Sequence, residues 1–401
     1  MNKKITRRAM LKAAGAVTAF EIMKPSTALG TQANSKVKAG VVGLGGRGAL
    51  IARHVKKNNG FEITAVADYF DDRVKEIGKE LGVPEKSSFS GLSGYKKLIE
   101  SGVEAIYLET PPCFFPEHAR VAVDAGCHVY VAKPVACDVP GTMSMKASGE
   151  KATKNKQVFL IDFQTRTDPV IAEGVEKVQA GMIGKIGMID SIYADGGFRD
   201  PPKGKTIEGR LQHLIWTNDI ELGGGMLVNS GVHMVDLGLW MNGDKLPLSA
   251  MGVANVVKAN PNGDTAYIYS LTYEFESGVV MNHRGDHLKN RVGYATCFAN
   301  CQQGYFESGY GGMNRIIGNK TGWRGADVGG IYISGIERNI ATFHKSICEE
   351  KYDNPTLIPS INSNLATILG REAGRRKTKL TMDEVIKENR RLDVDLTGLK
   401  S

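Results

Sequence analysis

Three glycines and one aspartate have the spacing of a phosphate-binding turn and a ribose-binding carboxylate. The glycines recur as G-x-G-x-x-G over residues 43–48, and Asp68 lies 20 residues after Gly48. Each glycine serves a different purpose in such a turn. The first allows a tight turn, the second a close approach of the backbone to a pyrophosphate, and the third close packing of a helix on a strand. A dinucleotide site is therefore predicted at Gly43, Gly45, Gly46, Arg47, Gly48 and Asp68.

The flanking residues supply the strands and the helix that such a turn needs. Residues 37–42 are apolar, as in a buried parallel strand, and residues 49–57 have a helical pattern. The helix N-terminus would offer free N–H groups to phosphates. A second apolar strand over 61–67 ends at Asp68. An alternative function for Asp68 is to cap the helix predicted at 71–81.

Strands and helices continue to alternate after Asp68. Apolar strands are predicted at 104–108, 127–131 and 157–163, with helices between them. This alternation is typical of a doubly wound parallel sheet, which binds its ligand outside the carboxyl ends of the strands. Thr110, Pro111, Lys133 and Gln164 follow such ends, so we expect them in the same crevice as the glycine turn.

The pattern changes after residue 165. A helix at 169–180 precedes strands that follow one another without helices, at 189–194, 250–257, 266–275 and 279–283. Such runs indicate a second, α+β domain with antiparallel strands. Helices return at 335–350, 363–376 and 383–391. We therefore divide the chain into segments 1–33, 36–164, 165–380 and 381–401.

The basic charge is concentrated at the N-terminus. The net charge is +8, and residues 1–28 carry +5 of it, which leaves too little elsewhere to indicate nucleic-acid or membrane binding. Arg7 and Arg8 fit a twin-arginine export signal, with cleavage after Ala28 or Ala33. The apolar segment at 13–20 is too short to span a bilayer. We expect export of the folded protein to the periplasm.

Cysteines and histidines give weaker signals. The six cysteines lack a C-x-x-C pair, so a structural zinc site is not expected. We expect free, buried thiols, with a local Cys297–Cys301 disulfide as the alternative. His283 and His287 flank residues 284–286, but no third ligand is evident, so no metal site is predicted.

Two longer motifs resemble the Gfo/Idh/MocA oxidoreductases. Residues 104–134 are similar to that family's cofactor-side loop, helix and Glu-Lys-Pro strand end. Residues 223–236 resemble its Gly-Gly-Gly…Asp-x-Gly-x-His-x2-Asp motif, and the likeness covers about 36–380. It implies an α/β fold: an N-terminal doubly wound Rossmann domain, then an α+β domain with a large, mostly antiparallel open sheet. That sheet presents substrate to the nicotinamide.

The resemblance implies that Lys133 and His233 are the catalytic pair. Histidine suits a general base, and a lysine can stabilise negative charge on oxygen or relay a proton. Two departures stand out: Ala132 replaces the glutamate of Glu-Lys-Pro, and Asn229 replaces the aspartate that would accompany His233. Asn229 can still orient the substrate or the imidazole. The structural alternatives are a solvated lysine and a satisfied buried histidine.

The expected function is NAD-dependent oxidation of a secondary hydroxyl of a sugar or glycoside, specifically at C3 of a glucoside. NAD is favoured because Asp68 would repel a 2′-phosphate. A small carbohydrate is the expected partner, and Arg166 and Asp195 are candidates to line its site. A homo-oligomer formed through the sheet domain is also possible. The alternatives are an NAD-dependent glycosidase of the oxidation–elimination type, such as an alpha-N-acetylgalactosaminidase, and a non-catalytic sugar- or nucleotide-binding protein.

Overall fold

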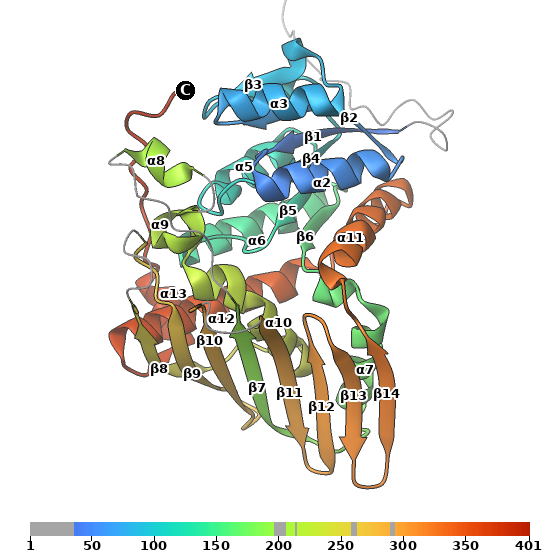
Figure 1. Cartoon of the computed structure of the whole chain (residues 1–401), viewed down its shortest axis with the longest axis vertical. Helices are drawn as coiled ribbons and strands as arrows, with labels where there is room; N and C mark the ends of the chain where they lie inside the picture. Colours follow the sequence, from blue (N-terminus) through green and yellow to red (C-terminus); the bar gives the residue numbers. More distant parts are fainter. Residues whose placement is uncertain (1–35, 196–205, 213–214, 258–262, 289–292) are drawn as a thin grey trace, which may run out of the picture. The chain divides into compact units, whose positions relative to one another are not determined.

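Two β-sheets organise the protein in the computed structural model, which describes residues 36–195, 206–212, 215–257, 263–288 and 293–401 (Figure 1). The first sheet has the order β3-β2-β1-β4-β5-β6 and is parallel throughout. Its strands are Val37–Val42 (β1), Phe61–Asp68 (β2), Ser88–Ser90 (β3), Ala105–Leu108 (β4), His128–Ala132 (β5) and Phe159–Asp162 (β6).

This sheet confirms the doubly wound fold. Strands β4 and β6 are buried along their whole length because helices cover both faces, which explains their continuous apolar runs. The order reverses between β1 and β4, and ligands bind at such a switch point. The sequence did not reveal β3, whose three residues include two serines.

Helices from both halves of the chain cover the first sheet. Ile336, Ile340 and Phe343 of the late helix Ile331–Cys348 (α11) join the core formed by β1, β4 and α2. The ring of Phe343 stacks on Phe61, with centroids 5.9 Å apart. The other covering helices are Gly46–Lys57 (α2), Asp71–Leu81 (α3), Gly94–Glu100 (α4), Phe115–Asp124 (α5) and Val139–Lys154 (α6).

The second sheet has nine strands in the order β14-β13-β12-β11-β7-β10-β9-β8-β15. All its pairs are antiparallel except β7 with β10, so the predicted mostly antiparallel sheet is confirmed. Its strands are Ile186–Ala194 (β7), Ser249–Asn255 (β8), Ile268–Glu274 (β9), Val280–Asp286 (β10), Tyr294–Cys301 (β11), Gly304–Gly309 (β12), Met313–Gly318 (β13), Gly322–Asp327 (β14) and Leu380–Thr381 (β15).

Helices pack on one face of the second sheet. Along β9, Tyr269, Leu271 and Tyr273 are buried while Ser270 between them is exposed, as the two-residue strand period requires. The covering helices are Pro169–Gln179 (α7), Val232–Met241 (α10) and Leu357–Arg376 (α12). A π-helical turn at Leu227–Gly231 leads directly into α10.

Short elements complete the described chain: Ile207–Leu211 (α8), Ile220–Gly223 (α9) and Met382–Glu388 (α13), followed by a tail without regular structure. No helix among the described residues has the length and apolar character needed to cross a membrane. The export signal predicted at 1–33 lies outside the described residues.

All six cysteines are free, so the alternative of a Cys297–Cys301 disulfide is wrong. The expectation that the thiols are buried holds for Cys127, Cys137 and Cys297. It is wrong for Cys348, which is exposed at the end of α11.

Candidate active site

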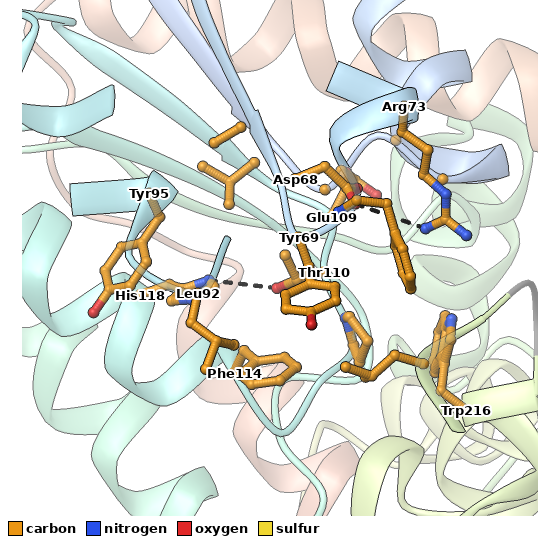
Figure 2. A pocket seen from close by; sticks show the side chains of 18 of the residues that line it. Asp68, Tyr69, Arg73, Leu92, Tyr95, Glu109, Thr110, Phe114, His118 and Trp216 are labelled. Atoms are coloured by element: carbon orange, nitrogen blue, oxygen red, sulfur yellow. Dashed lines mark hydrogen bonds and ion pairs between the residues drawn. The ribbon is translucent and has the colours of Figure 1, made fainter. Parts of the chain in front are cut away.

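A deep pocket opens at the carboxyl ends of β1, β2 and β4 (Figure 2). It encloses about 830 Å³, part of it open to solvent, which suits a ligand of cofactor size. Most of the predicted dinucleotide residues line it; Lys133 and Gln164 do not. The predicted residues on its wall are Gly43, Gly45, Gly46, Arg47, Gly48, Asp68, Thr110 and Pro111.

The glycine turn has the geometry that each glycine requires. Gly43 has a φ of +93°, and a Cβ there would lie 2.6 Å from the carbonyl carbon of Glu109. A Cβ on Gly48 would lie 1.8 Å from the carbonyl oxygen of Gly43, so helix α2 could not pack this closely on β1. A Cβ built on Gly46 would meet no atom of the described residues within 4 Å, which leaves the start of α2 open to an anionic ligand.

Asp68 ties the turn to the next loop. One carboxylate oxygen accepts a hydrogen bond from the backbone N–H of Leu44 at 2.6 Å, and the other from Phe70 N–H at 2.9 Å. Burial raises the pKa of Asp68, and these two hydrogen bonds oppose the rise. Helix α3 starts after Phe70 without a side-chain cap, so the capping alternative for Asp68 is wrong.

Arg73 points back toward Asp68 because it lies one helical turn into α3. Its guanidinium is 3.8 Å from the Asp68 carboxylate (Figure 2). It also lies 4.4 Å from the centre of the Phe70 ring. Arg73 lies too far along the sequence from Asp68 to suggest a contact between them. The helical backbone at the start of α3 nevertheless brings the Arg73 side chain back to the carboxylate. The pocket therefore holds a cation beside the carboxylate.

Aromatic side chains form the opposite wall. The His118 ring lies 4.1 Å from the Tyr95 ring and 5.8 Å from the Phe114 ring, and His118 Nδ1 is 3.4 Å from Thr110 Oγ1 (Figure 2). Burial lowers the pKa of His118 to about 4, so the imidazole is neutral at neutral pH. This wall is suited to a flat heteroaromatic ring.

The second half of the chain closes the pocket mouth. Trp216 and Leu211 line the pocket and pack in a small apolar cluster with Val394, Leu396 and Leu399 of the tail. The tail (red in Figure 1) is also fixed by hydrogen bonds: the backbone N–H of Leu92 donates to Lys400 O at 2.9 Å, and Lys400 N–H donates to the Tyr69 hydroxyl at 3.3 Å.

Arg47 connects the pocket to a buried group of acids. Its guanidinium pairs with Asp162, lies 3.4 Å from Glu109 and donates to the Tyr332 hydroxyl at 3.1 Å. Burial raises the pKa of Glu109 to about 8, although the charge of Arg47 opposes the rise. Asp162 also accepts a hydrogen bond from Gln164 at 2.8 Å.

Lys133 lies beside these acids and bonds to Asn229. Its ammonium donates to the Asn229 carbonyl oxygen at 2.7 Å and to the Asn229 side-chain oxygen at 3.2 Å. Burial, reinforced by the charge of Arg47, lowers the pKa of Lys133 to about 7. The interpretation of Lys133 as a solvated lysine is therefore wrong. The two hydrogen bonds to Asn229 orient the Lys133 side chain.

His233 has no hydrogen-bond partner at Nδ1 among the described residues. It lies in the first turn of α10, is 6% exposed, and is surrounded by the rings of Phe163, Tyr193 and Tyr310 at 4.7–6.3 Å. Burial and the charges of Lys133 and Arg47 hold its pKa well below the usual range. The interpretation of His233 as a satisfied core histidine does not fit this free nitrogen.

Gln164 bridges the two halves of the site. It donates to Asp162 and accepts a hydrogen bond from the Tyr310 hydroxyl at 3.0 Å, and the Tyr310 ring lies 4.7 Å from His233. Arg166, by contrast, is engaged by Asp236 at 2.8–3.0 Å and by Asp244 at 2.5–3.3 Å. Those ion pairs place the Asp236 carboxylate in a structural contact with Arg166.

The sequence analysis did not predict several residues that the structure places in this site. Glu109 and Asp162 could have been found, because Glu109 directly follows β4 and Asp162 ends β6, both parallel strands of the first sheet. Tyr193 and Tyr310 could not, since single aromatic residues on alternating strands are usually core. Among the described residues, no group of three acids, cysteines or histidines could hold a metal ion.

Comparisons with known proteins agree with this architecture. Residues 37–160 match the oxidoreductase family model with an NAD-binding Rossmann fold, and residues 173–305 match the GFO/IDH/MocA C-terminal domain. The structure is similar to that of myo-inositol 2-dehydrogenase from Lactobacillus plantarum, with a TM-score of 0.69 and 20% identity over 86% of this chain and 99% of that one.

Curated relatives match shorter parts. The scyllo-inositol 2-dehydrogenase (NAD(+)) of Bacillus subtilis is 26% identical over 61% of this chain and 65% of its own length. A glycosyl hydrolase family 109 protein of Porphyromonas gingivalis is 33% identical over 27% of this chain and 23% of its own length. The matches thus span less than two thirds of both relatives. Since the two domain models cover more than half of the sequence, the chain belongs to the Gfo/Idh/MocA oxidoreductase family.

Proposed function

We propose that this protein is an NAD-dependent oxidoreductase that oxidises a secondary hydroxyl of a polyol or sugar. The observation that carries the proposal is the half-buried Lys133 amine, whose pKa is lowered to about 7 where β5 ends, together with the His233 nitrogen that has no hydrogen-bond partner among the described residues. A proton acceptor is most effective when its pKa lies near the ambient pH.

The pocket fits the cofactor. Open space at Gly46, the start of α2 and the aromatic wall at Tyr95 and His118 suit the pyrophosphate and the adenine of a dinucleotide. When bound, the nicotinamide supplies the hydride acceptor. We assign cofactor contacts to Gly43, Gly45, Gly46, Arg47, Gly48, Asp68, Thr110, Pro111, Lys133 and Gln164.

The chain's own residues would handle the proton. The neutral imidazole of His233 would accept the hydrogen bond and then the proton of the substrate hydroxyl as the hydride leaves the adjacent carbon, and the neutral Lys133 amine would take up that proton from the imidazole. Asn229 holds Lys133 in place through two acceptors. Lys133 follows a strand of the first sheet, and Asn229 lies just before α10, which packs on the second sheet. Their hydrogen bonds therefore join the part of the chain that would bind the cofactor to the part that would bind the substrate.

The two inositol dehydrogenases among the comparisons favour a polyol or sugar as substrate class. Within that class, oxidation at C3 of a glucoside is our specific proposal. The similarity to a glycosyl hydrolase family 109 protein favours one second candidate, a glycosidase that oxidises, eliminates and reduces back. A non-catalytic binding protein is disfavoured, because the Lys133 amine is held by two acceptors of Asn229 and His233 keeps a buried nitrogen without a partner among the described residues, which is an arrangement for proton transfer.

One assay separates these functions. Purified protein is incubated with NAD and a panel of inositols, methyl glucosides and p-nitrophenyl glycosides. A dehydrogenase produces reduced nicotinamide and a ketone, and a redox-assisted glycosidase releases p-nitrophenol without net reduction. Neither product from any compound would contradict the proposal.

We further propose that the protein is exported folded to the periplasm under the direction of residues 1–33. The support is Arg7 and Arg8 before a short apolar segment. Replacement of both arginines with lysine should retain the precursor in the cytoplasm. Fractionation that still finds the processed form outside the inner membrane would contradict this interpretation.

A further inference from the structure

A second histidine lies near His233 and is held by a carboxylate. His287 follows strand β10 and Asp195 follows strand β7, and these neighbouring strands are parallel, with Asp286 opposite Ala194 (Figure 1). Both side chains therefore emerge at the same end of the second sheet. His287 Nδ1 and Asp195 Oδ1 are 2.7 Å apart.

The other nitrogen of His287 has no hydrogen-bond partner among the described residues. His287 is only 2% exposed, and its Nε2 is buried. Since the Asp195 carboxylate can only accept, Nδ1 donates the hydrogen bond, and in the neutral ring Nε2 is then a hydrogen-bond acceptor. A buried acceptor without a donor is unfavourable and points to a missing ligand.

Strand geometry places the His287 ring on the face of the second sheet against which α10 packs, the helix that carries His233. Met281, His283 and His287 alternate along one face of β10, and α10 packs against that face at Met281. The Tyr193 ring lies 5.8 Å from the His287 ring and 6.1 Å from the His233 ring, so Tyr193 separates two imidazoles.

The charge of the pair also acts on the catalytic lysine. The Asp195 carboxylate is one of the groups that raise the pKa of Lys133, against the larger lowering by burial. Lys133, His233 and the His287–Asp195 pair therefore lie within one electrostatic neighbourhood. The Nε2 of His283 also lacks a hydrogen-bond partner among the described residues. His283 differs in its surroundings, because its Nδ1 is bonded to Ser191 at 2.9 Å and a Cβ built on Gly231 or Gly285 would lie 3.2–3.4 Å from its Nε2.

We propose that the His287–Asp195 pair is a substrate subsite, in which His287 Nε2 accepts a hydrogen bond from a second, non-reacting hydroxyl of the substrate. This inference rests on the proposed function and narrows it to compounds with at least two hydroxyl groups. A site built around a hydrogen bond rejects an analogue that lacks the hydroxyl, because the buried acceptor is then left unpaired.

The kinetic test compares an oxidised inositol with its deoxy analogues. In the His287→Ala variant, kcat/KM for the inositol should fall at least about tenfold, as expected for one lost hydrogen bond to substrate. The preference for inositol over the relevant deoxy compound should collapse, while NAD affinity by calorimetry stays unchanged. The matched control is His283→Gln, which should keep that preference. An equal loss with both compounds would overturn the subsite.

A second measurement does not depend on turnover. In ¹⁵N-histidine spectra, His287→Gln identifies the resonances of His287 in the wild-type protein. The proposal predicts a proton on Nδ1, a bare Nε2, and a shift of Nε2 when myo-inositol is added with NAD. A proton on Nε2 would overturn it. If the wild type oxidises no polyol, the proposed function fails, and these spectra still decide whether His287 binds a hydroxyl.

Discussion

At the scale of single residues, the proton chemistry depends on the environment of Lys133. With a pKa of about 7, the amine is protonated below that pH and cannot accept a proton, so oxidation should lose rate as the pH falls below about 7. In Asn229→Asp, a carboxylate replaces an amide 3.2 Å from the ammonium. An adjacent negative charge favours the protonated form and raises the pKa of Lys133.

The acid limb of the pH–rate profile should therefore move to higher pH in Asn229→Asp. Profiles of kcat/KM for both proteins, with oxidised inositol or glucoside as substrate, test this shift. A limb that stays in place would show that Lys133 does not control it. Asn229→Ser serves as an uncharged control, for which no such upward movement is expected.

Asp68 should set the choice of dinucleotide. The carboxylate at the end of β2 disfavours a 2′-phosphate, but Arg73 lies 3.8 Å away and would pair with one. We expect NAD to bind more tightly than NADP, and Asp68→Ala to narrow or reverse that preference because Arg73 remains. Calorimetry of both nucleotides with Asp68→Ala and with Arg73→Ala checks this. Tighter NADP binding to the wild type would contradict it.

The residues of the glycine turn were predictable because a turn, a strand and a helix are local. The partner of Asn229 was not. Sequence spacing placed Asn229 one helical turn before His233, yet its side chain bonds to Lys133, 96 residues away. Such pairing is set by how the two domains pack, which no local pattern contains.

At the scale of elements, the C-terminal tail (residues 392–401) packs behind one wall of the cofactor pocket. Leu392, Val394 and Leu396 are partly buried and alternate with exposed residues, and Leu396 and Leu399 pack in the cluster that contains Trp216. Removal of residues 392–401 should weaken NAD binding and speed its release, because Trp216 and Leu211 lose their backing. Stopped-flow fluorescence of bound NADH measures that release.

A point variant separates packing from chain length. Leu399→Ala should accelerate release in the same direction as the deletion, whereas Asp393→Ala, an exposed tail residue, should not. Unchanged release from the deleted protein would mean that the tail only covers the surface.

The elements of the first sheet could be predicted more fully than those of the second. Buried parallel strands such as β4 are short, wholly apolar runs, which stand out from the helices around them. Strands β12 to β14 mix glycine and polar residues with one to three large apolar residues each and lack a regular alternation, so their pattern resembles loops. Their position in a nine-stranded sheet follows from pairing with neighbours.

At the scale of the whole molecule, one face of the second sheet is not covered by any helix of the described residues. Large apolar side chains are exposed there on several strands, including Met188 on β7, Met251 and Val253 on β8, and Ile317 on β13. An exposed apolar sheet face of this kind is typical of an interface. We propose that a second copy of the chain covers it.

The double variant Met251→Lys and Val253→Lys should then dissociate the oligomer, because burying two ammonium groups is costly. Light scattering coupled to gel filtration gives the mass of both proteins. A wild-type protein that is monomeric at micromolar concentration would contradict the proposed assembly.

The central claim is that Lys133 and His233 oxidise a hydroxyl of a polyol or sugar with NAD. The most direct measurement is the formation of reduced nicotinamide from the inositol and glucoside panel by the wild type, Lys133→Met and His233→Ala. We predict turnover of at least one compound by the wild type and a loss of at least about a hundredfold in each variant, with NAD still bound by His233→Ala. Near-normal turnover in both variants, or no reduced nicotinamide from any compound with the NAD-loaded wild type, would contradict the account.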